Sequence, residues 1–199
     1  YREALHPSLR LSGESDGYFD QYKVDCLKRW VIADDRPYDI LDFGCGIGKL
    51  TSLIARALPQ CTVWGFDPSP KCLEQARKQA ASVMNLHWVS QPPEGRRYDV
   101  ITAVNVFHHI APSERPRILA RLRRLLKPAG VLVIFEHNPL NPLTRYAVKR
   151  CPFDADAKLV WSRSLLRAAC QSGWQAARKC YIVFFPKFLK VLRRFEPTL

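Results

Sequence analysis

The sequence predicts an α/β domain built on a doubly wound, mostly parallel sheet flanked by helices. Between residues 38 and 135, short stretches rich in β-branched residues alternate with amphipathic stretches of helical period, which is the pattern of repeated β-α units. A glycine-rich turn joins the first strand to the first helix, and an acidic residue ends the second strand. The 199 residues suffice for one such domain and are too few for two, so we expect a single domain over 1–199.

Five strands are expected in this core. Two of them are continuous apolar runs, typical of central parallel strands that are buried on both faces. The five are Tyr38–Phe43, Cys61–Phe66, Leu86–Val89, Tyr98–Val104 and Val131–Phe135. A sixth strand is expected at Tyr181–Phe185.

Helices are expected between the strands. Ile47–Leu58 ends before Pro59, because the residue before a proline disfavours helix. Ser69 as N-cap and Pro70 at the first helical position open the helix Pro70–Ala81. A third helix runs from Ser113 to about Gly130. Outside the core we expect helices at 14–33, Ser162–Gln171 and Pro186–Phe195, and a proline-punctuated loop at Glu136–Cys151.

The composition indicates a globular protein with excess positive charge. Hydrophobic residues make up 47% and charged residues 25% of the chain. No apolar run approaches the roughly 20 residues of a membrane span, and the first residues lack a signal-peptide pattern. Seven cysteines without Cys-x-x-Cys spacing favour free thiols over disulfides or structural zinc. We therefore expect a cytoplasmic protein, without a membrane span, that is a monomer or a homodimer.

The formal net charge of +13 favours an acidic partner or substrate. Much of the excess, however, falls on one expected helix, where Arg117, Arg121 and Arg124 share a face opposite an apolar stripe. A solvated outer face explains that pattern without any ligand.

The segment Asp42–Gly48 reads Asp-Phe-Gly-Cys-Gly-Ile-Gly and lies between an expected strand and helix. Glycine permits a sharp turn and a close approach of the backbone to a ligand. The helix that follows offers free N–H groups and a positive dipole end. A dinucleotide site would place its third glycine at position 49, which is Lys49 here. The carboxylate of Asp42 would repel a pyrophosphate and could hold a cation such as an amino group.

The second expected strand ends in Asp67. A carboxylate at that position can accept two hydrogen bonds from a ribose diol. Asp67 could instead simply open the turn Asp-Pro-Ser-Pro that follows.

These motifs resemble class I S-adenosylmethionine-dependent methyltransferases. The similarity lies in Leu41–Leu50, Asp67 and Tyr98–Ile110, and it is closest to the small-molecule branch related to ubiquinone-biosynthesis enzymes. The resemblance implies a Rossmann-like fold with S-adenosylmethionine as cofactor, and contacts to the cofactor from Asp42, Gly44, Cys45, Gly46, Asp67, Pro68, Ser90, Asn105 and Val106. The family commonly has an acid near Ser90 that meets the adenine amine, and it is replaced here.

The segment 136–154 is similar to bacterial methyltransferases of secondary-metabolite and polysaccharide pathways. The resemblance divides the chain into a helical lid region at 1–36, a cofactor-binding core at 37–136 and a substrate-side part at 137–199. In the lid helix, Tyr22 could face the sulfonium and Lys23 could reach the methionine carboxylate. Ordinary core packing is the alternative for the aromatic residues of this helix.

Catalytic candidates follow the fourth and fifth expected strands, whose carboxyl ends should be neighbours. His108, His109, Glu136 and His137 could supply a general base for the acceptor proton, with His109 and His137 favoured. Consecutive helical side chains point about 100° apart, so we expect at most one of His108 and His109 to face the site. A metal site lacks tight ligand spacing, and no metal is predicted. Alignment of acceptor, methyl and sulfur could also suffice without a base.

Substrate contacts are expected in the loop after the fifth strand, from Asn138, Asn141 and Arg145, because arginine suits a carboxylate or phosphate. The predicted activity is methyl transfer to oxygen or nitrogen of a small molecule. An anionic molecule is one candidate for this acceptor. The alternatives are an RNA methyltransferase, a non-catalytic S-adenosylmethionine-binding regulatory domain, and a protein that binds NAD. The sequence after the fourth strand differs from the Pro-Pro pattern of many base-methylating enzymes, so a nucleic-acid substrate is not expected.

Overall fold

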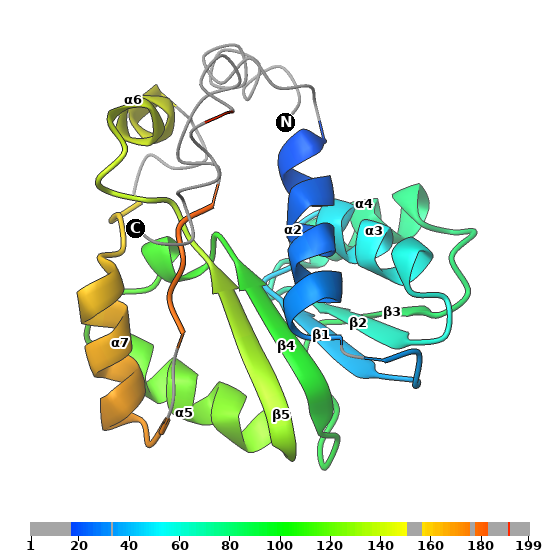
Figure 1. Cartoon of the computed structure of the whole chain (residues 1–199). Coiled ribbons are helices and arrows are strands. Elements are labelled where there is room, and N and C mark those ends of the chain that lie inside the picture. Colours follow the sequence, from blue (N-terminus) through cyan, green and yellow to red (C-terminus); the bar gives the residue numbers. More distant parts are fainter. Residues whose placement is uncertain (1–16, 33, 151–156, 176–177, 183–190, 192–199) are drawn as a thin grey trace. The chain divides into compact units, whose positions relative to one another are not determined.

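The computed structural model of this protein describes residues 17–32, 34–150, 157–175, 178–182 and 191. Figure 1 shows its helices and strands. In chain order they are α2 (Tyr18–Trp30), β1 (Asp39–Phe43), α3 (Lys49–Ala57), β2 (Thr62–Phe66), α4 (Pro70–Gln79), β3 (Leu86–Val89), β4 (Tyr98–Val104), the 3₁₀ turn η1 (Phe107–His109), α5 (Arg115–Leu125), β5 (Leu126–Phe135), α6 (Pro142–Arg150) and α7 (Ser162–Gln171).

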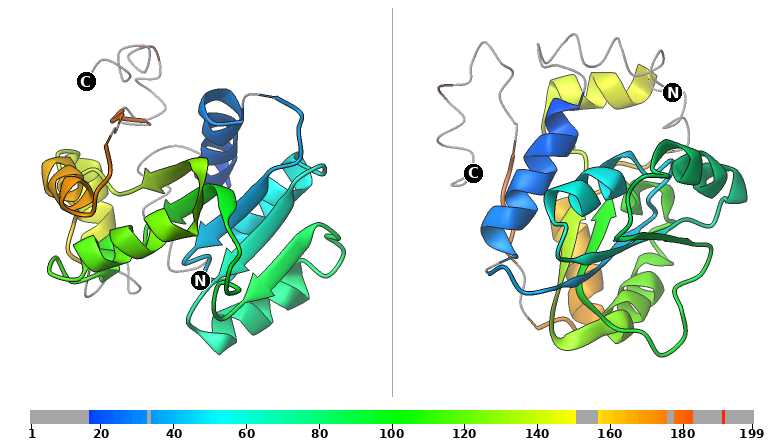
Figure 2. Two further views of the ribbon diagram at one scale, coloured as in Figure 1. Left: turned by 90° about the horizontal axis from the view of Figure 1, so that it is seen from below. Right: turned by 90° about the vertical axis from the view of Figure 1, so that its right-hand side faces the viewer.

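The sheet has five strands in the order β3-β2-β1-β4-β5, and every pairing is parallel. The arrows in Figures 1 and 2 accordingly point the same way. The chain adds β2 and β3 on one side of β1 and then returns to add β4 and β5 on the other side. The carboxyl ends of β1 and β4 therefore form the topological switch point, where ligands bind in sheets of this kind. The predicted doubly wound fold is confirmed.

Buried aliphatic residues explain the central strands. Ile40 and Leu41 of β1 and Val100 and Ile101 of β4 are at most 2% exposed, as expected of strands covered on both faces. The predicted strand at Val131–Phe135 is too short, because β5 begins at Leu126. A register irregularity opposite Tyr98 lets β5 include the Pro-Ala-Gly segment that we assigned to the helix end.

The predicted loop at Glu136–Cys151 is wrong in part, because residues 142–150 form the helix α6. Asn141 precedes it and accepts a hydrogen bond from the backbone N–H of Thr144 through its side-chain oxygen (3.3 Å). This is N-cap geometry, and Pro142 occupies the first helical position, where its missing N–H costs nothing. The prolines that suggested a loop thus mark the start of a helix.

Two other predicted elements extend beyond the described residues. Tyr181 and Ile182, the first two residues of the expected sixth strand, are in no helix or strand, and the rest of that strand lies outside the described residues. The expected tail helix Pro186–Phe195 also lies outside them, apart from Val191. Of the expected helix 14–33, the residues Tyr18–Trp30 form α2.

The contacts of the chain divide it into two compact units. The sheet unit comprises Phe19–Val106 and Ala120–Phe135, and it contains β1–β5 and α2–α4. The second unit contains Phe107–Leu119 and the described residues from Glu136 onward, with η1, α6 and α7. The expected single domain remains a prediction.

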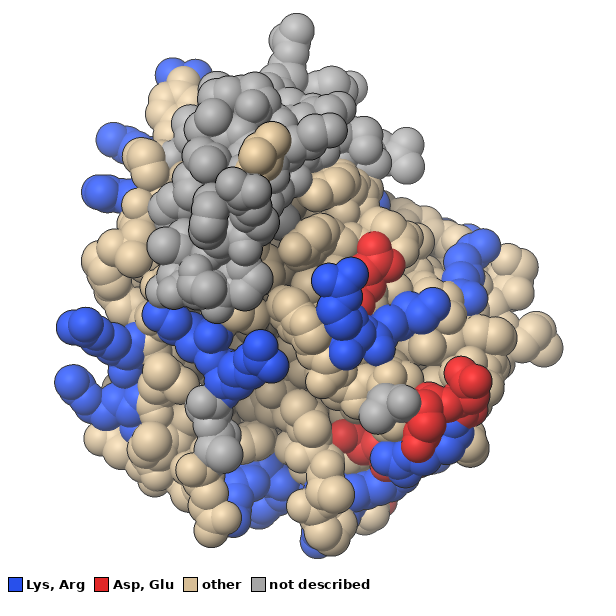
Figure 3. Space-filling model, in the orientation of Figure 1, with Lys and Arg blue, Asp and Glu red and all other residues tan. Residues whose placement is uncertain are grey.

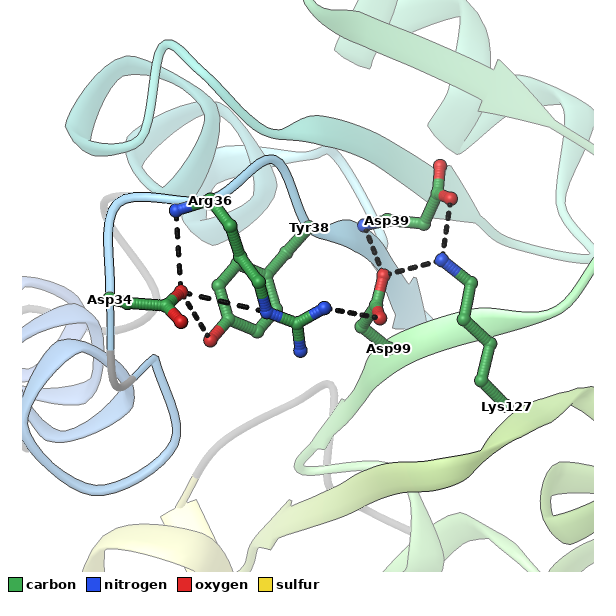
Figure 4. A network of polar contacts seen from close by, with 6 residues as sticks. All are labelled: Asp34, Arg36, Tyr38, Asp39, Asp99 and Lys127. Carbon is green, nitrogen blue, oxygen red and sulfur yellow. Dashed lines mark hydrogen bonds and ion pairs between the residues drawn. The ribbon is translucent and has the colours of Figure 1, made fainter.

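Ion pairs join the amino ends of the strands in the sheet unit (Figure 4). Lys127 donates to Asp99 (2.7 Å) and to Asp39 (3.0 Å), and Asp99 also accepts the backbone N–H of Asp39 (2.8 Å). Arg36 pairs with Asp99 and with Asp34, at 3.5 Å each. These contacts tie β1, β4 and β5 together at the edge opposite to the carboxyl ends of the strands.

Figure 3 shows basic side chains at several places on the face that it draws. On α5, Arg117, Arg121 and Arg124 are exposed, as the solvated-face interpretation predicts. Among the described helices, none has both the length and the hydropathy that crossing a membrane requires.

Candidate active site

The glycine loop follows β1, and its three glycines adopt the left-handed conformation, with φ of 78° at Gly44, 54° at Gly46 and 74° at Gly48. The backbone N–H groups of Gly44 and Cys45 both donate to the carbonyl of Phe66, at 2.8 and 2.9 Å. These bonds fold the loop onto the carboxyl end of β2. A Cβ on Gly46 would meet no atom within 4 Å, so open space borders the loop at its centre.

Asp42 is the last polar residue of β1 and is only 2% exposed. One carboxylate oxygen accepts the hydroxyl of Thr51 on α3 (2.6 Å) and the other accepts the hydroxyl of Thr102 on β4 (2.8 Å). The bond to Thr51 closes the glycine loop at its base. Burial raises the pKa of Asp42, while the two hydroxyl donors and the charge of Lys23 oppose that rise. The site therefore holds a buried carboxyl group whose ionised form is favoured by any added positive charge.

Asp67 begins the turn after β2 and is 9% exposed. Its carboxylate accepts the backbone N–H of Gly46 (2.8 Å) and the backbone N–H of Ser69 (2.9 Å). The bond to Ser69 shows that Asp67 does open the turn, which was the alternative to ribose binding. The bond to Gly46 adds a contact that neither interpretation included, between Asp67 and the glycine loop. Each carboxylate oxygen can accept a second hydrogen bond, so these contacts leave room for a diol.

The remaining loop residues of the sheet unit border the same edge. Asn105 has φ of 55°, the single non-glycine residue with positive φ in the described chain, and its N–H donates to the carbonyl of Phe135 (2.9 Å). Val106 lies against Gly44, where an added Cβ would come within 2.6 Å of its Cγ2. The positive φ of Asn105 is a form of backbone strain, and such strain is concentrated at functional sites. Pro68 and Ser90, which follow β2 and β3, are exposed.

Cys45 lies in the loop with its Sγ 3.7 Å from the carbonyl of Gly46. Burial raises the pKa of its thiol, and the charges of Asp42 and Asp67 add to the rise. The thiol is thus held in its neutral form, which is a poor nucleophile.

Helix α2 belongs to the sheet unit and is anchored by Val24, Cys26 and Leu27, which are buried. Asp20 on this helix pairs with Lys49 of α3 (3.1 Å) and with Lys23 (3.4 Å). The ion pair between Asp20 and Lys49 therefore joins α2 to the first turn of α3. Tyr22 and Lys23 are half-buried, and their roles toward a cofactor remain predictions.

In the second unit, Glu136 organises the histidine cluster, by which we mean His108, His109 and His137. One oxygen of Glu136 accepts the backbone N–H of Phe107 (2.6 Å), and the other lies 2.8 Å from Nδ1 of His108. The ring centroid of His108 is 4.1 Å from that of His109 and 5.3 Å from that of His137. His108 is 2% exposed, whereas His109 is exposed and His137 half-buried. The adjacent histidines of η1 thus differ in access to solvent, and which of them faces the site remains a prediction.

Arg115 supports the histidine cluster, and the sequence did not indicate this role. It is 4% exposed, and its Nε donates to the carbonyls of Phe107 (3.2 Å) and Ile110 (3.1 Å). A third bond reaches the carbonyl of Lys158 (3.4 Å). Burial lowers the pKa of Arg115, and the charge of Glu136 opposes this. Arg115 holds the η1 turn in shape, although the arginine-rich stretch suggested only a solvated face.

The predicted substrate contacts have local roles in the second unit. The side-chain oxygen of Asn138 accepts the N–H of Leu140 (2.9 Å), and Asn141 is the buried N-cap of α6. Arg145 is exposed on α6. No group of three or more His, Cys, Asp or Glu side chains among the described residues could hold a metal ion.

The known proteins to which this chain is similar are methyltransferases. Residues 41–132 match the family model described as a methyltransferase domain. The chain is 36% identical over 116 residues to malonyl-[acyl-carrier protein] O-methyltransferase of Halalkalibacterium halodurans, a match that covers 54% of this chain and 42% of that protein. It is 32% identical over 143 residues to trans-aconitate 2-methyltransferase of Rhodopseudomonas palustris, with coverage of 68% and 51%. The chain thus spans about half the length of the curated relatives that it matches.

Solved structures share the fold at low identity. Magnesium protoporphyrin IX methyltransferase from Synechocystis PCC 6803, crystallised with S-adenosylhomocysteine, superposes with a TM-score of 0.65 at 21% identity and covers 90% of this chain and 82% of its own. A TehB-like S-adenosylmethionine-dependent methyltransferase from Corynebacterium glutamicum has a TM-score of 0.56 at 22% identity, with coverage of 82% and 76%. The Rossmann-like sheet predicted from the sequence is the fold of these proteins.

Proposed function

We propose that this chain, whose residues 41–132 belong to the methyltransferase domain family, binds S-adenosylmethionine and transfers its methyl group to oxygen or nitrogen of a small molecule. The main support for this proposal is the buried Asp42 carboxylate at the base of a glycine loop that borders open space. A negative charge there repels a pyrophosphate and attracts a cation. S-adenosylmethionine carries both an ammonium and a sulfonium and lacks a pyrophosphate.

The cofactor contacts divide between the two acids. We assign the methionine part to the loop residues Gly44 and Gly46 above Asp42, with Lys23 available for its carboxylate. The ribose diol is assigned to Asp67, whose oxygens already accept two backbone N–H groups and have lone pairs left. Ser90 and the backbone beside it are the candidates for the adenine.

The histidine cluster is the candidate general base. Glu136 accepts a hydrogen bond from Nδ1 of His108 when that nitrogen is protonated, which would fix the tautomer of the ring. His109 is the exposed member and is assigned the acceptor proton, with His137 as the second candidate. S-adenosylmethionine would supply the methyl group to the acceptor, and its sulfur would keep the electron pair of the broken bond. The imidazole would take the proton that the acceptor loses, so that charge balances. A hydroxyl acceptor requires this step, and an amine that arrives neutral requires it less.

The acceptor that the site favours is a small molecule, and an anionic one is supported by the exposed Arg145 and the net charge of +13. A cytoplasmic location is supported by the seven cysteines of the sequence, which lack the spacing of a disulfide framework. That the protein is a monomer or a homodimer remains a prediction from the sequence.

The test is release of S-adenosylhomocysteine by the purified chain across pooled metabolites sorted into hydroxyl, amine and carboxylate acceptors. The proposal expects release with at least one pool, and much slower release with Asp42→Asn at the same low concentration of S-adenosylmethionine. Cofactor binding by calorimetry without release from any pool would favour a regulatory domain. Release with RNA, together with affinity that falls steeply as salt rises, would transfer the assignment to an RNA methyltransferase.

A further inference from the structure

Trp88 is the third residue of β3, and the cofactor assignments leave it unused. Its indole ring packs beside the glycine loop. We propose that Trp88 is a positioning residue: it holds the loop and the first turn of α3 in the conformation that binds S-adenosylmethionine. This inference rests on the proposed function, since it concerns the same cofactor loop. It is argued from the atoms that the indole ring of Trp88 contacts.

The ring lies over two glycines from different elements. Trp88 pairs with Gly65 of β2 in the sheet register, and a Cβ on Gly65 would come within 2.5 Å of its Cε3 and Cζ3 atoms. A Cβ on Gly48, the N-cap of α3, would overlap the far edge of the same ring and lie 2.7 Å from Cζ3. The indole therefore extends from β3 across β2 to the start of α3.

Small residues form the slot that receives the ring. Ala76 of α4 has its Cβ 2.9 Å from the position that a Cβ on Gly48 would take. Gly65 has no positive φ, so its backbone would accept a side chain and only the neighbouring atoms exclude one. Cys45 of the loop is one of those neighbours, with Sγ at 3.2 Å from the same added Cβ. Loop and indole thus share the surface of Gly65.

The consequence for binding follows from where the loop is attached. Its first N–H groups donate to Phe66, and Gly46 donates to Asp67, both at the end of β2. Its far end is Gly48, which is buried and abuts Trp88. Without the indole, that end of the loop would border a cavity and could relax away from the geometry set at the other end. A loop that must reorder on binding loses affinity through the entropy of ordering.

The test compares two tryptophans that lie on adjacent strands. Trp64 neighbours Gly65 on β2, and since side chains alternate along a strand it points to the opposite face. There its ring stacks on His87 (4.4 Å) beneath the guanidinium of Arg96 (4.4 Å). We expect Trp88→Leu to raise the calorimetric Kd for S-adenosylmethionine at least tenfold, Trp64→Leu to change it less than threefold, and Trp88→Phe to retain most of the affinity. Equal effects of Trp88→Leu and Trp64→Leu would overturn the proposal.

A double-mutant cycle separates positioning from general loss of stability. Gly65→Ala should raise the Kd at least tenfold in the wild-type background and less than threefold in the Trp88→Leu background, because the clash partner is gone. Should Gly65→Ala not fold alone, recovery of a cooperative melt in the double variant supports the same contact. Equal effects of Gly65→Ala in both backgrounds, on Kd or on melting, contradict it. A wild-type chain that binds no S-adenosylmethionine would reject the proposed function, while the melting arm would still test the slot.

Discussion

The glycine loop of the sheet unit and the histidine cluster of the second unit are held in place by different kinds of contact. The loop is fixed mainly by its own backbone, with left-handed glycines and N–H groups that donate to Phe66 and Asp67. The cluster depends on long buried side chains that reach backbone groups, Glu136 to Phe107 and Arg115 to three carbonyls. The glycine spacing predicts a loop that is fixed by its backbone. The sequence named the histidines and Glu136 but did not indicate the side-chain contacts that hold them. The variants below test each part of this contrast.

The largest effect is expected in the histidine cluster. His109→Ala should lower kcat by about 100-fold or more with a hydroxyl acceptor, the range of a lost general base, and leave cofactor affinity unchanged. Stopped assays of S-adenosylhomocysteine release, with calorimetry in parallel, measure both quantities. His137→Ala is the second candidate, and His87→Ala, an exposed histidine on β3, is the matched control. Unchanged rates in both cluster variants would leave alignment of the reactants as the mechanism.

Asp67 should control affinity rather than the chemical step. Asp67→Ala removes the proposed ribose acceptor together with the hydrogen bonds from Gly46 and Ser69. We expect the Kd for S-adenosylmethionine to rise about 30- to 100-fold, which corresponds to about 2–3 kcal/mol. Asp67→Asn, which keeps one acceptor oxygen, should fall between wild type and Asp67→Ala. The exposed Glu94 offers a control in Glu94→Ala, and an equal loss there would point to a general charge effect.

Thr102 should set the pH range of cofactor binding. Burial raises the pKa of Asp42 and the hydroxyls of Thr51 and Thr102 lower it, so Thr102→Val raises that pKa further. Binding of a cation favours the ionised form, and affinity is therefore lost as pH falls through the pKa of Asp42. The variant should lose affinity at a higher pH than wild type and bind about tenfold more weakly at pH 7. Calorimetric titrations from pH 5 to 8 give the profile, and coincident profiles would remove Thr102 from the account.

The smallest functional effect is expected at the opposite edge of the sheet, in the network of Figure 4. Burial acts to raise the pKa of Asp99, but the hydrogen bonds from Lys127 and from the N–H of Asp39 outweigh it, and the pKa lies below its usual value. The resulting stabilisation is present above the unfolded pKa of about 3.9 and is lost as pH falls through the folded value.

Asp99→Asn should therefore lower the free energy of unfolding by about 1–2 kcal/mol at pH 7. The deficit should shrink below about pH 4, and the Kd for the cofactor should not change. Urea denaturation at several pH values measures the first two quantities. A large loss of cofactor affinity in this variant would show that the two edges of the sheet are coupled.

The sequence was most informative for the sheet unit. Runs of Val, Ile and Phe predicted β1–β4 to within one residue at each end. The predicted start of β5 was too late, because Pro128 was interpreted as the end of the preceding helix. Asp42 and Asp67 were found from their spacing to the glycines. Their partners were not, since Thr102 lies 60 residues from Asp42 and the register of β1 and β4 brings them together.

The second unit was harder to predict for two physical reasons. Proline has opposite meanings inside and at the start of a helix, and without the capping role of Asn141 the start of α6 could not be recognised. Arg115 belongs to a stretch of arginines whose other members are exposed, and only packing distinguishes it. The sequence likewise did not indicate a role for Trp88, because the slot that receives its ring depends on the pairing of β2 with β3.

The central claim is that the buried Asp42 selects S-adenosylmethionine as the ligand of the glycine loop. Calorimetric titration of the chain with S-adenosylmethionine and with NADH, for wild type, Asp42→Asn and the control Asp39→Asn at the other end of β1, tests it directly. We predict binding of one S-adenosylmethionine by wild type and Asp39→Asn, a rise in Kd of about 100-fold in Asp42→Asn, about 2.7 kcal/mol, and no heat with NADH. Equal affinity in all three proteins, or binding of NADH in place of S-adenosylmethionine, would contradict the claim.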